Sequence, residues 1–129
     1  MRRHRSRSVP LMAVALTLGI AGCGSAGGSG GAERVPGATS NRIVRAELSE
    51  LGQLSGLEAV QRLRPRWLRA RGGGTPVLYV DGARRGTTRD LDAISSTEIE
   101  QMEYMSSADA SNRFGTGHQG GAVLVSTRR

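Results

Sequence analysis

Few side chains of this 129-residue sequence could carry out catalysis. Beyond His4 near the N-terminus, the single histidine is His118, and a general base needs a nucleophile and an orienting partner beside it. No Ser-x-His arrangement supplies them, so we expect His118 to be a polar turn residue. Glu98 and Glu100 would share one face of a strand and Glu103 the other, which favours a solvated face over a catalytic pair. One histidine with scattered carboxylates also offers no metal site.

A glycine pattern near the C-terminus has the spacing of a nucleotide-binding loop. Gly115, Gly117 and Gly120 form Gly-x-Gly-x-x-Gly, which in dinucleotide-binding proteins follows a strand and opens a helix. Here the order is reversed, since we expect a helix before it and a strand after it. We interpret the pattern as a turn in which the chain doubles back beside another backbone segment. We therefore expect no enzyme, no cofactor and no small-molecule substrate.

The densest run of charge is a group of arginines around one tryptophan. This arginine patch is the candidate interaction site of the sequence, and it consists of Arg62, Arg64, Arg66, Trp67, Arg69 and Arg71. One interpretation is a solvated helix face. The other is contact with phosphates or an acidic partner, including lipid head groups if the protein is held at a membrane. We expect Trp67 to be a core anchor, although an exposed tryptophan beside arginines would suit an interface.

The first 22 residues have the order of a secretory signal. A basic segment with Arg2, Arg3, Arg5 and Arg7 precedes an apolar run over 9–21, and small residues precede Cys23. Spanning a bilayer takes about 20 apolar residues, so this run is too short to do so. We expect residues 1–22 to be a lipoprotein signal peptide that is removed.

Ile20-Ala21-Gly22-Cys23 resembles a bacterial lipobox. The resemblance implies diacylglyceryl transfer to the Cys23 thiol, cleavage before Cys23 and acylation, with palmitate for example, of the new N-terminus. Several acyl chains anchor stably, because each buried methylene contributes about 0.8 kcal/mol. The alternative is an ordinary signal with an incidental cysteine. Gly24 rather than aspartate after Cys23 favours, by analogy, the outer membrane, so we expect a lipid-anchored cell-envelope protein that faces the periplasm.

The charge balance does not favour nucleic acid as a partner. All 18 basic residues are arginine, against 11 acidic residues, for a formal net charge of +7. Four of these arginines lie in the expected signal, so 14 basic residues remain against 11 acidic ones. The remaining excess is too small to indicate nucleic-acid binding. With Cys23 acylated, no thiol is left for a disulfide or a cysteine metal site.

The rest of the chain divides into a tether and one domain. Residues 23–41 are rich in glycine, serine and alanine, which predicts a lipidated flexible tether with a reach of about 25 Å. Residues 42–129 form the expected domain. A chain of that size buries only about 60–65% of its unfolded surface, so we expect marginal stability alone.

The domain is predicted to be α+β, with short strands and helices interleaved. A helix should begin at the Ser55–Glu58 capping box and end at Pro65. Thr88 should cap a helical turn at Leu91 and Ile94, and Ser107 should cap a helix over 108–114. The other elements are a strand or helical turn at 43–48 and strands over 77–80, 83–85, 99–105 and 121–127.

The order of these elements resembles the plug domain of TonB-dependent outer-membrane receptors. Residues 76–82, Pro-Val-Leu-Tyr-Val-Asp-Gly, resemble the apolar plug strand that ends in Asp-Gly. Residues 99–105 resemble a strand of the type I-E-x-V-E-V-L, and residues 108–115 resemble the short helix written S-A-L-Y-G. Residues 117–125 resemble G-A-x-G-G-V-I-N-I, and 57–68 fit an earlier plug helix less specifically. The resemblance covers roughly the last 75 residues.

The sequence also departs from the receptor pattern. A receptor adds a transmembrane barrel of strands with about 9–11 residues each, and we expect none in this chain. No clear TonB box lies in the tether, and Met105-Ser106-Ser107 stands where receptors have Arg-Gly-Pro. The resemblance therefore implies a fold and a docking habit, without a transport activity or ligand-binding residues.

Two functional hypotheses follow from the anchor, the tether and the plug-like domain. The first is a non-enzymatic protein-interaction module that meets an outer-membrane or other envelope protein. The second is a structural lipoprotein that contacts lipid head groups or cell-wall polymer through the arginine patch. A third, a hydrolase that depends on His118, has no other residue to support it.

Overall fold

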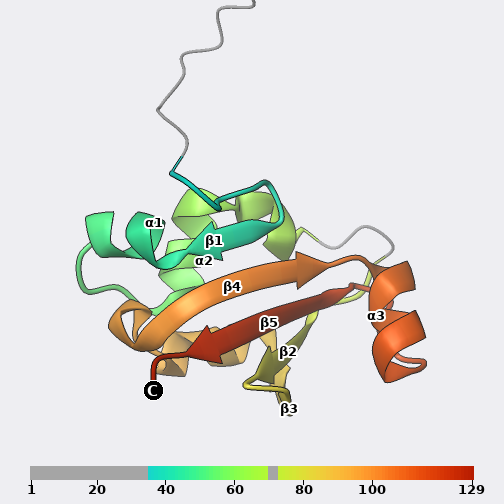
Figure 1. The fold of residues 1–129 in the computed structure, drawn as a ribbon. Coiled ribbons are helices and arrows are strands. Elements are labelled where there is room, and N and C mark those ends of the chain that lie inside the picture. Colours follow the sequence, from blue (N-terminus) through green and yellow to red (C-terminus); the bar gives the residue numbers. More distant parts are fainter. Residues whose placement is uncertain (1–34, 70–72) are drawn as a thin grey trace, which may run out of the picture. The chain divides into compact units, whose positions relative to one another are not determined.

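The domain is built on one five-stranded mixed sheet, which confirms the α+β class (Figure 1). The computed structural model describes residues 35–69 and 73–129. The sheet order is β1-β4-β5-β2-β3. The elements in chain order are β1 (Arg42–Val44), α1 (Arg45–Glu50), α2 (Gly56–Leu63), the 3-10 helix η1 (Pro65–Leu68), β2 (Val77–Val80), β3 (Ala83–Thr87), the 3-10 helices η2 (Thr88–Ala93) and η3 (Ser96–Glu98), β4 (Ile99–Met105), α3 (Ser107–Phe114) and β5 (Ala122–Thr127).

Strand β5 forms the centre of the sheet. It pairs in parallel with β2, where Leu78 lies opposite Val123, and antiparallel with β4, where Met102 lies opposite Val125. The first four residues of β5, Ala-Val-Leu-Val, are all apolar, as expected for a strand that has neighbours on both sides. Strands β1 and β3 form the two edges.

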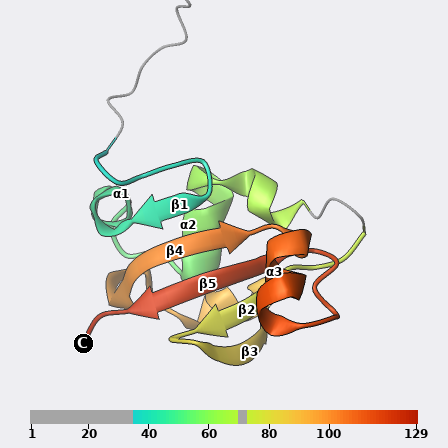
Figure 2. The same cartoon turned by 45° about the vertical axis from the view of Figure 1, so that its right-hand side comes forward.

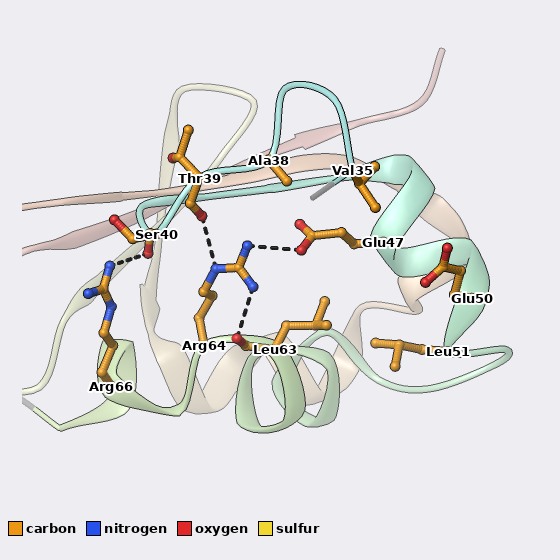
Figure 3. A pocket seen from close by; sticks show the side chains of 10 residues that line it. All are labelled: Val35, Ala38, Thr39, Ser40, Glu47, Glu50, Leu51, Leu63, Arg64 and Arg66. Atoms are coloured by element: carbon orange, nitrogen blue, oxygen red, sulfur yellow. Dashed lines mark hydrogen bonds and ion pairs between the residues drawn. The ribbon is translucent and has the colours of Figure 1, made fainter. Parts of the chain in front are cut away.

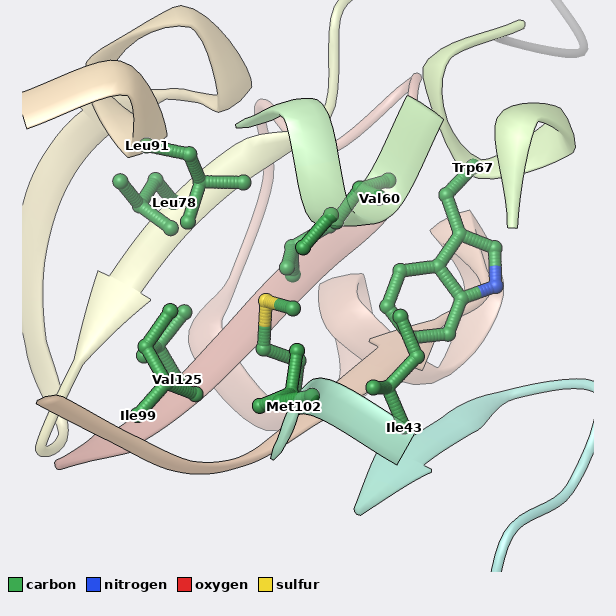
Figure 4. Close-up of a cluster of buried hydrophobic side chains, with 11 residues drawn as sticks. Ile43, Val60, Trp67, Leu78, Leu91, Ile99, Met102 and Val125 are labelled. Carbon is green, nitrogen blue, oxygen red and sulfur yellow. The ribbon is translucent and has the colours of Figure 1, made fainter. Parts of the chain in front are cut away.

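The main core lies between the sheet and the helices α1, α2, η1 and η2 (Figures 1 and 4). The alternation of side chains along each strand puts Leu78, Met102 and Val125 on the same side as Val60 and Trp67. Fully burying an aliphatic side chain stabilises the fold by about 1.5–3 kcal/mol relative to its exposure. The buried set that these residues belong to is Ile43, Leu48, Ala59, Val60, Trp67, Leu78, Leu91, Ile99, Met102, Val123 and Val125.

A second, smaller cluster lies on the opposite face, where α3 covers one end of the sheet (Figure 2). Val77, Tyr79 and Ala122 from the strands pack there against Ala110 of α3. Phe114, at the end of the same helix, lies partly buried against them. The sheet therefore has helices on both faces, but the second face is covered over a shorter length.

Helix α2 begins and ends where the sequence predicted. The Ser55 hydroxyl accepts from the Glu58 amide at 3.2 Å, and the Glu58 carboxylate accepts from the Ser55 amide at 3.0 Å. The helix stops at Leu63, because Pro65 disfavours helical geometry at Arg64, which takes φ −141° and ψ 59°. The chain continues as η1, with Pro65 as its first residue.

Two predicted helix caps were wrong by one residue. Thr87, not Thr88, precedes η2, and Thr88 is buried. Ser106, not Ser107, caps α3, and its hydroxyl accepts from an amide three residues on at 3.2 Å. In both places an acidic residue three positions later bonds the true cap, since Asp90 accepts from the Thr87 amide and Asp109 accepts from the Ser106 hydroxyl.

The glycine-rich turn before β5 is a close approach between backbones, as predicted. A Cβ atom on Gly120 would overlap the carbonyl oxygen of Gly74, and one on Gly121 would overlap the carbonyl oxygen of Met105. Gly121 also has φ +83°, a conformation that favours glycine. These two positions let β5 enter the sheet directly between β2 and β4.

Candidate interaction site

The residues of the arginine patch come from one stretch, the C-terminal end of α2 and the 3-10 helix η1. Arg62 lies in the last turn of α2, Arg64 follows that helix, and Arg66 and Trp67 belong to η1. Arg69 comes directly after η1. Two residues of the sequence prediction, Cys23 and Arg71, lie outside the residues that the structure describes.

Arg64 donates hydrogen bonds to four residues, Thr39, Arg42, Glu47 and Leu63, and Figure 3 shows three of them. Its Nε donates to the Thr39 carbonyl at 3.0 Å, and its Nη1 donates to the Leu63 carbonyl at 2.9 Å. Its Nη2 donates to Glu47 Oε1 at 2.9 Å and to the Arg42 carbonyl at 3.4 Å. We call these contacts the Arg64 clamp.

The ion pair in the Arg64 clamp is largely shielded from solvent. The side chains of Arg64 and Glu47 are only 17% and 13% exposed. Glu47 Oε2 also accepts from the Val44 amide at 3.4 Å, so both carboxylate oxygens have partners. Partial burial strengthens such a pair and raises the cost of removing one member. The charge of Arg64 is thus used within the domain.

Arg66 and Trp67 hold the same N-terminal segment from a second point. Arg66 Nη2 donates to the Ser40 carbonyl and to Asn41 Oδ1, the latter at 3.0 Å. Trp67 Nε1 donates to the Ser40 carbonyl at 3.1 Å. The indole is 1% exposed and stacks on Tyr104 with ring centres 6.0 Å apart. Trp67 is therefore the predicted core anchor and is not an exposed interface residue.

These contacts show that the folded domain begins nearer the N-terminus than the sequence predicted. The sequence placed residues 23–41 in the tether, but Thr39 and Arg42 exchange two backbone hydrogen bonds, at 3.0 and 3.2 Å. Ala38 also donates to the Val35 carbonyl at 3.0 Å. Composition did not reveal this, because the atoms that bind Arg64, Arg66 and Trp67 here are mostly backbone carbonyls. The folded domain includes residues from about Val35 onward.

Three arginines of the patch, Arg62, Arg66 and Arg69, are exposed to solvent, and of these Arg66 bonds the N-terminal segment. Arg62 and Arg69 form no ion pair within residues 35–69 and 73–129. They lie on either side of the residues that hold Thr39 and Ser40. The patch therefore combines arginines that stabilise the fold with arginines that could meet a partner.

A hollow of about 710 Å³ lies beside the Arg64 clamp, between residues 35–40, α1 and the end of α2 (Figure 3). Val35, Leu51 and Leu63 give it apolar walls, and the Glu47–Arg64 pair lies across it. Because these two charges bind each other, neither is available as a general base or an anion site. Within the described ranges, no group of three histidine, cysteine or acidic side chains could hold a metal ion.

His118 lies in the predicted turn, but its ring is buried, at 3% exposure. Its Nδ1 lies 2.8 Å from the Gly115 carbonyl oxygen and its Nε2 lies 2.9 Å from the Tyr79 hydroxyl. A carbonyl only accepts, so Nδ1 carries the hydrogen and Nε2 accepts from Tyr79 in the neutral ring. Tyr79 also stacks on Phe114 with centroids 4.2 Å apart. Both ring nitrogens of His118 thus hold the turn against β2 and α3.

The three glutamates near β4 do not converge, although their placement differs from the prediction. Glu98 lies in η3, before the strand begins, so it does not share a strand face with Glu100. Glu100 is exposed, and Glu103 pairs with Arg42 across the sheet at 3.5 Å. The side chains of that last pair are about two-fifths exposed, so it adds little to stability.

The Asp-Gly turn between β2 and β3 carries a carboxylate that the sequence analysis did not single out. Thr127 Oγ1 donates to Asp81 Oδ2 at 2.5 Å, and the Thr127 amide donates to Oδ1 at 2.9 Å. These bonds, with smaller contributions from Arg129 and Arg85, hold the pKa of Asp81 below its ordinary value. The partner is 46 residues away, so no local signal announces the contact.

Comparisons of the chain with protein-family models, curated proteins and solved structures found no match. Among the described helices, none has the length and apolar character needed to cross a membrane.

The Arg64 clamp predicts that substitutions of Arg64 and of Arg62 change the free energy of unfolding by very different amounts. Arg64→Ala should lower the free energy of unfolding by about 2–4 kcal/mol, because it leaves Glu47 and several carbonyls without their donor. Arg64→Lys should recover little, since one ammonium group cannot replace the planar fork of donors. Arg62→Ala is the matched control and should change stability by less than about 0.5 kcal/mol. Equal effects of Arg64→Ala and Arg62→Ala in urea unfolding would contradict the clamp.

The Asp81–Thr127 contact predicts a pH-dependent contribution to stability. The folded-state pKa of Asp81 is lowered, so its contribution is complete above the unfolded pKa of about 3.9 and is lost as pH falls through the folded value. Asp81→Asn should therefore destabilise the domain at neutral pH, and its difference from wild type should shrink below about pH 4. Asp92→Asn, at an exposed position, is the control. A difference that stays constant down to about pH 2 would rule out this role.

Proposed function

We propose that this protein is a lipid-anchored component of the cell envelope whose plug-like domain is a non-enzymatic protein-interaction module at the outer membrane. The observation that carries the proposal is the placement of the plug-like motifs. Residues 77–80 of the Asp-Gly motif run parallel to residues 122–125 of the Gly-Gly motif, in register. Residues 99–105 pair with the other side of that strand. Three of the plug-like segments are thus adjacent strands of one sheet, which supports the proposal of a plug-like domain.

The use of the polar side chains supports binding over catalysis. Both nitrogens of His118 are bonded within the fold, so neither is free to take a proton from a substrate. The carboxylates of Asp81 and Glu47 are likewise engaged by Thr127 and Arg64. Several exposed arginines, among them Arg62, Arg69 and Arg84, form no ion pair with a described residue, and such groups favour recognition of an anionic or acidic partner.

The position of the N-terminal segment fits a module held by a tether. The Arg64 clamp and Arg66 attach residues 39–41 to the β1 side of the domain. The rest of the domain is then free to meet a partner, and attachment to one membrane raises the effective concentration of that partner.

A second candidate function is supported by Arg62 and Arg69, two exposed arginines that form no ion pair with a described residue. They belong to the same stretch as Arg64 and Arg66, which hold residues 39–41, so a structural lipoprotein could contact lipid head groups or cell-wall polymer there. An arginine near an anionic membrane surface contributes about 1 kcal/mol. Loss of binding to anionic vesicles in Arg62→Gln/Arg69→Gln, with partner capture intact, would identify this role.

The proposal predicts that both the attachment of the lipid and the contact with a specific partner protein depend on Cys23. Cells that express the wild-type chain should incorporate labelled palmitate into it, and chemical crosslinking should recover a defined outer-membrane or envelope protein. Cys23→Ser should abolish the label and reduce the crosslinked product at least about tenfold, because the effective concentration at the membrane is lost.

The matched control is Ser25→Ala, a change in the same segment that leaves the thiol intact. Palmitate labelling that persists in Cys23→Ser would remove the anchor from the proposal. A wild-type chain that is labelled but yields no reproducible crosslinked protein would remove the interaction module.

A further inference from the structure

The sheet ends in an edge strand that pairs on one side only. Strand β3 has β2 as its only neighbour among the described strands (Figures 1 and 2). Four of its five residues are exposed. An edge strand presents unpaired N–H and C=O groups that can pair with another chain. The other edge differs, because at β1 Thr39 folds back and forms a bridge with Arg42. The β3 edge is thus the sheet's open side.

The charges of β3 define which strand could pair there. Arg84 and Arg85 belong to the strand, Arg89 follows it, and none of the three forms an ion pair with a described residue. The nearest carboxylates in the sequence are already engaged, since Asp81 accepts from Thr127 and Asp90 accepts from the Thr87 amide at 2.7 Å. The arginines of this edge are therefore available to acidic groups from outside the domain.

A bulge concentrates these charges. Leu78 lies opposite Gly86 and Tyr79 lies opposite Arg84, so Arg85 is the extra residue of β3 and has no partner on β2. Bulges and charged side chains on an edge oppose pairing with an identical copy, because arginine would face arginine. An acidic strand would meet the same arginines with favourable charge. The edge is thus selective for one class of partner.

We infer that the β3 edge is a strand-addition site for an acidic, extended segment of a partner protein. The inference rests on the proposed function in one respect, namely that the partner is a protein. The backbone of β3 would supply the pairing, and Arg84, Arg85 and Arg89 would supply the preference for acidic side chains. Four strand spacings, about 19 Å, separate β3 from β1 in the sheet, so this segment would not compete with the clamped N-terminal residues.

Two synthetic peptides test the inference with the full-length Cys23→Ser chain. The first alternates glutamate with threonine or valine over seven residues and carries a fluorophore. The second has the same sequence and charge, but alternate backbone amides are methylated so that they cannot donate. We expect saturable binding of the first peptide, with NMR amide shifts concentrated at residues 83–87, and at least tenfold weaker binding of the second.

Paired variants locate the site. Arg84→Gln/Arg85→Gln should weaken binding of the first peptide at least tenfold, whereas Arg62→Gln/Arg69→Gln removes the same charge at another surface and should leave binding within twofold. Thermal unfolding of each variant shows that the fold is retained, and the comparison of the two peptides needs no variant.

Three results would overturn the inference. The first is equal binding of the two peptides, which would mean that charge attraction alone binds them. The second is an equal loss of binding in the two paired variants. The third is no binding of the first peptide at 1 mM. None of these results affects the proposed function, because a partner crosslinked in cells could use another surface. Conversely, if no cellular partner were found, peptide binding at β3 would still show that the domain can add an acidic strand.

Discussion

One guanidinium group joins the parts of the domain that the sheet alone does not hold together. Arg64 bonds the backbone of Thr39 and Arg42, the carboxylate of Glu47 and the last carbonyl of α2. Its position depends on Pro65, which ends α2 and turns Arg64 out of helical geometry. Trp67 then enters the core and bonds Ser40 from the next turn. The arginine-rich stretch thus serves first to close the N-terminal segment onto the core, and only its exposed members remain for other contacts.

A second constraint is the close packing of the glycine turn that introduces β5. Gly120 and Gly121 allow the backbone to pass between Gly74 and Met105, which puts β5 between β2 and β4. His118, which is buried and bonds the Tyr79 hydroxyl, attaches the same turn to β2. The plug-like motifs become neighbours only because this turn is tight. The two edges then differ in role, since β1 is occupied by the chain itself and β3 is open.

Local patterns predicted most of the elements, and distant contacts explain what they missed. The Ser55–Glu58 capping box, the apolar runs of β2 and β5 and the Asp-Gly turn are local, so the sequence predicted them. The two cap errors were also local, since the acidic residue three positions on marks the true cap. By contrast, Arg64–Glu47 joins residues 17 apart and Tyr79–His118 joins residues 39 apart, with no signal in either segment. The resemblance to receptor plugs, the anchor at Cys23 and the role of the exposed arginines stay predictions.

The central claim is that residues 35–41 belong to the folded domain and are attached through Arg64, so that the chain leaves the domain beside β1. Native-state hydrogen exchange of the full-length chain, read at single amides by NMR, tests it most directly. The amides of Thr39 and Arg42 bond each other's carbonyls, so we predict that both exchange at least about a hundredfold more slowly than an unstructured chain. Exchange of both amides at the unstructured rate, with β2 and β5 still protected, would contradict the account.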